Sequence, residues 1–243
     1  MSNHLKRLAS PDSWQLKKKT HTFVTKTAPG PHTGEAMPMA IWLTEHMGLA
    51  RNRKEVKQIL HQRDIIVNGK PCRDLRMGVG VFDIISIPKI GKHYRLQLDK
   101  KGRLISIEIP EEAAGIRLCK IRDKTVVSGG RVQLNLLYGA NILADNTYRP
   151  RDSIVVTLGT GEDRFRIVDH FPFEEGNMAM VIGGKHSGKI GKIVEIVKTP
   201  SSQPNRVTLE DAAFGTGFET IDDYVFVIGR RTPSGEIIWG IEA

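Results

Sequence analysis

The sequence of 243 residues predicts an α+β fold that is mostly β. Helical periodicity occurs only between residues 38 and 61. From Val79 onward short apolar runs alternate with turn residues, and no long helices intervene. This pattern argues against a doubly wound α/β sheet and favours one or two small β-barrels. We expect four parts: an arm (1–36), a helix pair with a following β-hairpin (37–103), a central β-rich domain (104–172) and a C-terminal β domain (173–243).

The positive charge of the chain is concentrated in its first part. Residues 1–103 contain 20 Lys and Arg against 8 Asp and Glu, a net charge of +12, whereas residues 104–243 have a net charge of −3. A basic region joined to a near-neutral one favours a polyanionic partner such as RNA. A membrane partner is disfavoured, because no run approaches the ~20 apolar residues of a membrane span and no basic helix carries a large aromatic face.

The arm contains prolines, glycines and a compact charge run, Lys17 to Lys19. Segments of this composition rarely fold alone. Two outcomes stay open, a disordered tail and a segment that becomes ordered against RNA. No apolar stretch follows the basic residues at the N-terminus, so we expect no secretory signal and an intracellular, cytoplasmic protein.

The helix pair separates apolar from basic positions. We expect the first helix to begin at Pro38 and to end at Gly48, with Met39, Trp42, Leu43 and Met47 facing a core.

In the second helix, Val56, Ile59 and Leu60 share one face, and Asn52 with Glu55 resembles a capping box. Basic residues occupy roughly the opposite face: Arg53, Lys54, Lys57 and His61. Asn68-Gly69 then predicts a two-residue hairpin turn.

Short β-runs follow along the rest of the chain. They include 81–87, 94–98, 104–109, 125–132, 153–158, 165–168, 178–182, 190–197, 206–209 and 224–228.

The helix pair with its hairpin resembles the S-four RNA-binding module of ribosomal proteins, tyrosyl-tRNA synthetases and RNA-modifying enzymes. One departure is Asp64, where the module often has glycine. The matching residues are Leu43 to Leu49, Arg51, Arg53, Lys54, Arg63 and Val67-Asn-Gly. The resemblance implies a rigid plate that presents cations to phosphates.

A pseudouridine synthase is the first enzymatic alternative, because such enzymes carry the same module with a Gly-Arg-Leu-Asp motif. Here Gly102-Arg-Leu is followed by Ile105, so the required carboxylate is absent. The sequence therefore disfavours this activity.

The segment 174–197 supports two interpretations. Gly183 to Lys189 satisfies most of the phosphate-binding GxxxxGK[ST] pattern, but Ile190 replaces the hydroxyl residue and a β-run follows instead of a helix. We therefore expect no bound nucleotide. The same segment resembles a KOW motif, whose glycines allow tight turns while Lys185, His186, Lys189 and Lys192 lie around the loop. A plain β-hairpin stays open as the alternative.

Other chemistry has little support. Cys72 and Cys119 lack the spacing of a zinc site or a disulfide framework and are interpreted as buried or incidental thiols. The histidines and acids show no metal or nucleophile motif. We expect no catalytic residues, no cofactor and no metal.

The segment from His4 to Trp14, with basic residues around Pro11 and the tryptophan, resembles the signature of one ribosomal family. This is the e-type fourth protein of the small subunit in archaea and eukaryotes. An arm, an S-four module, a β-rich middle and a KOW unit occur in that order in the family. The resemblance covers essentially the whole chain, whose compact length leans towards an archaeal source.

The resemblance implies a structural constituent of the small ribosomal subunit that binds its ribosomal RNA, beside neighbouring ribosomal proteins. The strongest alternative is an RNA-binding translation or transcription factor that joins such complexes transiently. Cations would neutralise phosphates, and one tryptophan would pack or stack. The candidate RNA-binding residues are Lys6, Arg7, Trp14, Lys17, Lys18, Lys19, Arg51, Arg53, Lys54, Lys57, Arg63, Lys70, Lys185 and Lys189.

Overall fold

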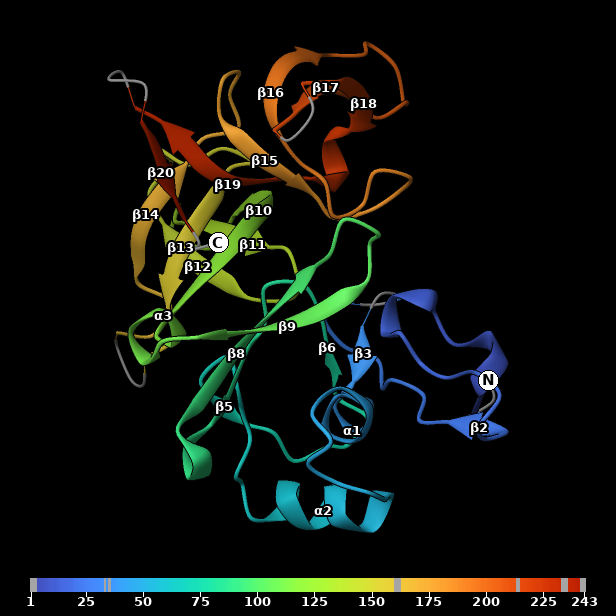
Figure 1. The fold of residues 1–243 in the computed structure, drawn as a ribbon. Coiled ribbons are helices and arrows are strands. Elements are labelled where there is room, and N and C mark those ends of the chain that lie inside the picture. Colours follow the sequence, from blue (N-terminus) through green and yellow to red (C-terminus); the bar gives the residue numbers. More distant parts are fainter. Residues whose placement is uncertain are drawn as a thin grey trace. The chain divides into compact units, whose positions relative to one another are not determined.

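The computed structural model describes residues 4–32, 34, 36–159, 163–212, 215–232 and 236–240 (Figure 1). Residues 1–3, 33 and 35 of the predicted arm lie outside the described residues. The chain divides into two compact units, one of residues 1–97 with 103–115 and the other of residues 98–102 with 116–243. We call them unit 1 and unit 2 and describe each by itself.

The arm begins unit 1 and is ordered over its described part. Strands β1 (Leu5–Lys6) and β2 (Phe23–Val24) pair antiparallel, with the 3₁₀ turns η1 (Arg7–Ala9) and η2 (Asp12–Trp14) between them. Trp14 is buried. The arm therefore contributes to the core of unit 1, an outcome that neither expectation for this segment included.

The predicted helix pair is present in unit 1. Strand β3 (Met37–Pro38) leads into α1 (Met39–Ile41), which continues in π-helical geometry as η3 (Trp42–His46), and α2 (Arg53–His61) follows. The first helix thus begins one residue later than predicted, because Pro38 is still extended. Met39, Trp42 and Leu43 are buried as expected, whereas Met47 is half-buried.

Besides the β1–β2 pair, the described β-structure of unit 1 forms one five-stranded and one further two-stranded sheet. The five-stranded order is β5-β4-β7-β8-β9, and β3 pairs with β6. The elements after α2 are β4 (Ile66–Val67), β5 (Lys70–Pro71), β6 (Gly78–Val79), β7 (Ile84–Ile87), η4 (Pro88–Ile90), β8 (Lys92–Leu98), β9 (Leu104–Ile109) and α3 (Glu111–Ala114).

Two turns of this unit depend on positive φ angles. Asn68 (φ 48°) and Gly69 (φ 76°) form the predicted hairpin turn between β4 and β5. The run predicted for 81–87 is shortened to β7, because Phe82 (φ 62°) lies in the left-handed region and ends regular pairing on that side.

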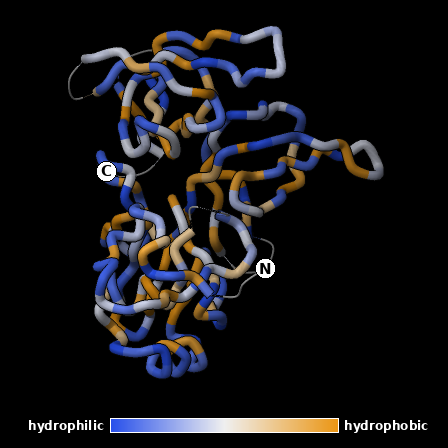
Figure 2. Tube along the Cα trace, turned by 90° about the vertical axis from the view of Figure 1, so that its right-hand side faces the viewer, coloured by the Kyte–Doolittle hydropathy of each residue, from blue (hydrophilic) through white to orange (hydrophobic). Residues whose placement is uncertain are grey.

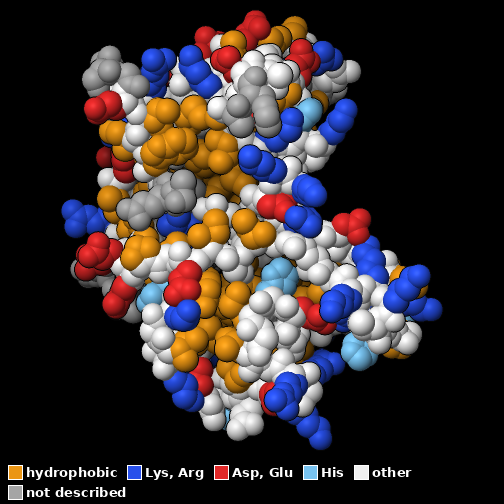
Figure 3. All heavy atoms as spheres, in the orientation of Figure 1, with side chains coloured by type: hydrophobic (Ala, Val, Ile, Leu, Met, Phe, Trp, Pro, Cys, Tyr) orange, Lys and Arg blue, Asp and Glu red, His pale blue; other side chains and the backbone are white. Residues whose placement is uncertain are grey.

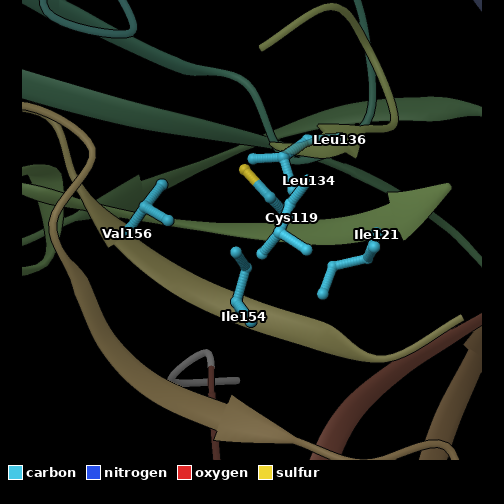
Figure 4. Packing of buried hydrophobic residues seen from close by; sticks show 6 residues of the cluster. All are labelled: Cys119, Ile121, Leu134, Leu136, Ile154 and Val156. Atoms are coloured by element: carbon cyan, nitrogen blue, oxygen red, sulfur yellow. The ribbon is translucent and has the colours of Figure 1, made fainter. Parts of the chain in front are cut away.

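Unit 2 begins with a five-stranded antiparallel sheet of order β12-β11-β10-β13-β14. A core of six buried residues from its strands is shown in Figure 4: Cys119, Ile121, Leu134, Leu136, Ile154 and Val156. The strands are β10 (Ile116–Val126), β11 (Val132–Leu136), β12 (Asn141–Ala144), β13 (Ser153–Thr157) and β14 (Ile167–Phe171). The run predicted for 125–132 is interrupted between the end of β10 and the start of β11, since Gly129 and Gly130 form a turn there.

The second sheet of unit 2 has the order β18-β17-β16-β15-β19-β20. Its elements are β15 (Met178–Val181), β16 (Ile190–Val197), β17 (Arg206–Asp211), β18 (Gly217–Ile221), the 3₁₀ turn η6 (Asp222–Tyr224), β19 (Val225–Arg231) and β20 (Ile237–Trp239). Over the described residues both sheets are open in their hydrogen-bonded order. The Cα tube of Figure 2 shows hydrophobic and hydrophilic stretches interspersed along the chain.

A buried lysine joins the two sheets of unit 2. The Lys120 Nζ on β10 donates to the carbonyl oxygens of Asp222 (2.9 Å), Asp223 (2.9 Å) and Val225 (2.7 Å). Burial lowers the pKa of Lys120 to about 7, and the nearby Arg151 acts in the same direction. A single side chain thereby satisfies three carbonyl groups.

The cysteine prediction is confirmed. Cys72 and Cys119 are both buried free thiols, and burial raises the pKa of Cys72 to about 11. Among the described residues no cluster of His, Cys, Asp and Glu suits a metal ion. The helices in that part of the chain are all too short or too polar to cross a membrane.

Candidate nucleic-acid interface

Helix α2 presents a row of basic residues because its N-terminus and its apolar face are fixed. Asn52 Oδ1 accepts from the backbone N–H groups of Lys54 (2.9 Å) and Glu55 (3.1 Å), as the predicted capping box requires. Glu55 Oε2 reaches back to the N–H of Arg51 (2.7 Å), one residue before the cap. Val56 and Leu60 are buried, so the helix cannot rotate about its axis without exposing them.

The basic residues of α2 face solvent. We call Arg53, Lys54, Lys57 and His61 the α2 cation face; all four are exposed. None of these side chains has a hydrogen bond or an ion pair within the described part of the chain. Unpaired cations on a rigid helix retain their full charge for an external anion. Figure 3 shows Lys and Arg side chains gathered over α2 and over the arm on this face of the molecule.

The turn after α2 adds a further predicted residue. Arg63 is exposed and takes a positive φ of 61°, and its backbone N–H donates to the Leu60 carbonyl (3.2 Å). The neighbouring Asp64, where the S-four module often has glycine, forms an ion pair with Lys89 (3.2 Å). The left-handed turn is therefore provided by Arg63. Arg51 and Lys70 are exposed as well.

The predicted residues of the arm divide into buried and exposed groups. Arg7 is 3 % exposed, and its guanidinium donates to Glu45 (2.7 Å) and to the Lys17 carbonyl (2.7 Å). Trp14 is 2 % exposed, with its carbonyl 3.0 Å from the His46 ring. Neither side chain reaches the surface of the isolated chain.

The lysines of the arm lie further out. Lys6, Lys17 and Lys19 are exposed, and Lys18 is half-buried beside Asp12, with which it forms an ion pair.

A buried contact between a histidine and a carboxylate holds the end of the arm. His32 Nε2 lies 2.8 Å from Asp83 Oδ2, and both side chains are almost fully buried. The same carboxylate accepts from the N–H of Gly80 (3.0 Å) and from Asn68 Nδ2 (2.8 Å). A Cβ at Gly80 would lie 2.3 Å from the His32 ring, so only glycine permits this approach. Sequence reasoning missed this contact, because its members are far apart in the chain.

The residues 183–189, which we call the KOW loop, are braced by aromatic rings. The His186 ring lies 4.8 Å from the ring of Phe218, and Lys189 Nζ lies 5.0 Å from that ring and 4.0 Å from Asp211. Burial lowers the pKa of His186, and Lys189 and Lys185 act in the same direction.

The close turns of the KOW loop need its glycines. A Cβ at Gly183 would come within 2.7 Å of the Tyr224 ring. Strand β16 starts at Ile190 directly after the loop, so no helix N-terminus is present to hold a triphosphate, as the sequence predicted. Of the two predicted lysines in the loop, Lys185 is exposed and Lys189 is engaged within the protein.

Comparisons with known proteins agree with these features. Residues 175–210 match the KOW motif, and residues 1–35 match the RS4NT (NUC023) domain. Residues 90–162 match the model of the ribosomal family S4e. The KOW prediction is therefore confirmed over the loop and its flanking strands, and the fold is that of a modular ribosomal protein.

Relatives extend the match over the full chain. The small ribosomal subunit protein eS4 of Methanospirillum hungatei is 55 % identical over all of both chains, and that of Archaeoglobus fulgidus is 40 % identical over 97 % of each. The crystal structure of the 30S ribosomal protein S4e from Thermoplasma acidophilum superposes with a TM-score of 0.66 at 25 % identity, over 81 % of this chain and 96 % of that one. The chain belongs to the ribosomal family S4e. This membership confirms the predicted family, and it confirms that the protein is not an enzyme.

Proposed function

We propose that this protein is a structural constituent of the small ribosomal subunit that binds the subunit's ribosomal RNA and stabilises its folded form. The observation that carries the proposal is the α2 cation face, four exposed basic side chains on a capped helix that have no partner among the described residues. Membership of the S4e family supports the RNA of the small subunit as the ligand. In this proposal residues 37–103 form an S-four-type RNA-binding module, between the arm (1–36) and the β domains 104–172 and 173–243.

The mechanism is electrostatic and geometric. Helix α2 and the turn at Arg63 hold cations at fixed spacing, because Val56 and Leu60 anchor the helix and Asn52 caps it. Each phosphate neutralised releases counterions, which supplies affinity without base specificity. The exposed lysines of the arm extend this contact with RNA. Arg7 and Trp14 contribute by holding the arm against the rest of unit 1.

Charge reversal on α2 tests the RNA-binding proposal. In the triple variant Arg53→Glu, Lys54→Glu and Lys57→Glu, affinity for small-subunit ribosomal RNA should fall. The slope of log K against log salt should flatten by roughly 0.7 to 0.9 for each lost contact. The matched control reverses three exposed cations of unit 2: Lys101, Lys198 and Arg206. An equal loss in both triple variants, or an unchanged slope in the folded α2 variant, would contradict a specific role for α2.

The KOW match favours a second candidate function, a factor that joins the small subunit only transiently. Sedimentation through a high-salt gradient separates the two functions. A structural constituent remains with the small subunit, whereas a transient factor is recovered at the top of the gradient. The triple variant of α2 should be recovered at the top of the gradient instead of with the small subunit.

A further inference from the structure

A cavity of about 450 Å³ lies between the C-terminal half of α2 and the segment after β5. Its floor is apolar, since Leu60 is 1 % exposed and Leu75 is 7 % exposed. Its rim is polar and is formed by Lys57, His61, Arg63, Arg73 and Asp74. The volume lies within the ~300–1,000 Å³ that small-molecule sites occupy.

The rim has an excess of unneutralised positive charge. The side chains of Lys57, His61, Arg63 and Arg73 are exposed and have no hydrogen-bond or ion-pair partner in the described ranges of the chain. The one acid of the rim, Asp74, uses its Oδ1 to accept from the N–H of Arg76 (2.9 Å). That bond fixes the turn that carries Arg73. The rim is therefore suited to an anion.

The apolar floor narrows the class of ligand. A phosphate alone needs cations but gains nothing from two leucine side chains beneath it. A nucleotide has both parts, because its base presents a flat apolar face and its phosphates are anionic. Unpaired bases of RNA are commonly splayed out and stacked on planar groups such as a guanidinium or an imidazole, which Arg73 and His61 supply.

We propose that this cavity receives one unpaired nucleotide of the bound RNA. The base lies over Leu60 and Leu75 beside the planar groups of Arg73 and His61, and its phosphates meet Lys57 and Arg63. The inference rests on the RNA-binding function proposed above and adds recognition of an unpaired base to it. It also adds Arg73, which the sequence did not single out, to the candidate RNA-binding residues.

Two RNA probes test the inference with the full chain. One is a short RNA duplex that contains a single unpaired adenosine, and the other is the same duplex fully paired. Wild-type protein should bind the bulged duplex roughly tenfold more tightly, the effect of stacking one base. The double variant Arg73→Lys with His61→Ala keeps the arginine's charge but removes both planar groups. Its preference for the bulged duplex, measured as the ratio of the two affinities, should fall to roughly twofold or less.

A matched double variant on the same helix provides the control. Arg53→Lys with Gln58→Ala changes two exposed residues that do not line the cavity, and it should retain the wild-type preference. Equal binding of the two duplexes by the wild type would overturn the cavity proposal and leave general RNA binding intact. Retention of the preference by the Arg73 variant would overturn it too. Failure of the wild type to bind either duplex or ribosomal RNA would instead count against the proposed function.

Discussion

The α2 cation face and the KOW loop are both basic, but their cations are in different physical states. On α2, Arg53, Lys54 and Lys57 are exposed, and none has a side-chain partner within the described residues. In the KOW loop, Lys189 lies over the Phe218 ring and beside Asp211, although Lys185 is exposed. A count of positive residues in the sequence therefore overstates how much of the loop is available to RNA. Charge that is already engaged within the protein contributes to its stability more than to RNA affinity.

The largest expected effect concerns the aromatic support of the KOW loop. Phe218→Ala should lower the free energy of unfolding by about 3 kcal/mol, because the ring is 8 % exposed and contacts His186 and Lys189. Denaturant unfolding measures this change. The control Phe23→Ala removes a ring that is 54 % exposed and should cost less than about 1 kcal/mol. RNA affinity, measured at denaturant concentrations well below the unfolding midpoint, should stay at the wild-type level. A large loss of RNA affinity under these conditions would contradict a purely structural role for Phe218.

Removal of the α2 cap should have the next largest effect on stability. Asn52→Ala should reduce the free energy of unfolding by about 1 kcal/mol, since two N–H groups at the start of the helix lose their acceptor. RNA affinity should fall with it, because the cap fixes the turn that carries Arg53 and Lys54. Gln62→Ala at the other end of the helix changes an exposed side chain and serves as the control. If the Asn52→Ala variant has reduced stability but full RNA affinity, the cap does not support RNA binding.

Single lysine changes compare the two regions directly. Lys57→Gln should reduce the slope of log K against log salt by roughly 0.7 to 0.9, the loss of one phosphate contact. Lys189→Gln should leave the slope unchanged, because that ammonium group is already placed over Phe218. Salt titrations of RNA binding measure both values. A larger change for Lys189 than for Lys57 would reverse the comparison between the regions.

The smallest expected effect on stability comes from the protonation of His186. Its pKa is lowered by burial and by the two nearby lysines, so the unfolded chain binds this proton more tightly than the folded chain. This contribution to the free energy of unfolding is therefore smallest at acidic pH and increases as the pH is raised towards the usual histidine pKa of about 6.5. Lys185→Gln should raise the His186 pKa towards that value, as measured by an NMR titration. An unchanged pKa would show that Lys185 does not contribute to the shift.

Local structure was predictable where it depends on neighbours in the sequence. The Asn52 cap and the Asn68-Gly69 turn both use residues within a few positions of one another. The long strand β10 was not predicted beyond its last residues. Its buried Arg117 and Lys120 interrupt the apolar alternation by which strands are found in a sequence.

The candidate site was only partly predictable for the same reason. The exposed cations of α2 follow from helical periodicity, which sets which residues face the core. The cavity beside Arg73 depends on a segment that returns to α2 after a hairpin, so no periodic pattern places the two together. Whether an expected cation is free is likewise decided by partners elsewhere in the chain.

The sequence by itself determined the order of the parts, the amphipathic second helix, the KOW loop and the family. Only the tertiary structure decided which charges are available. Arg7 was grouped with the RNA-binding cations, but it is buried against Glu45, 38 residues away. Lys120 was only one cation among many, but it donates to carbonyl groups more than 100 residues away. Burial and pairing depend on which distant residues meet in the fold, and the energy of a charge depends more on those surroundings than on its type.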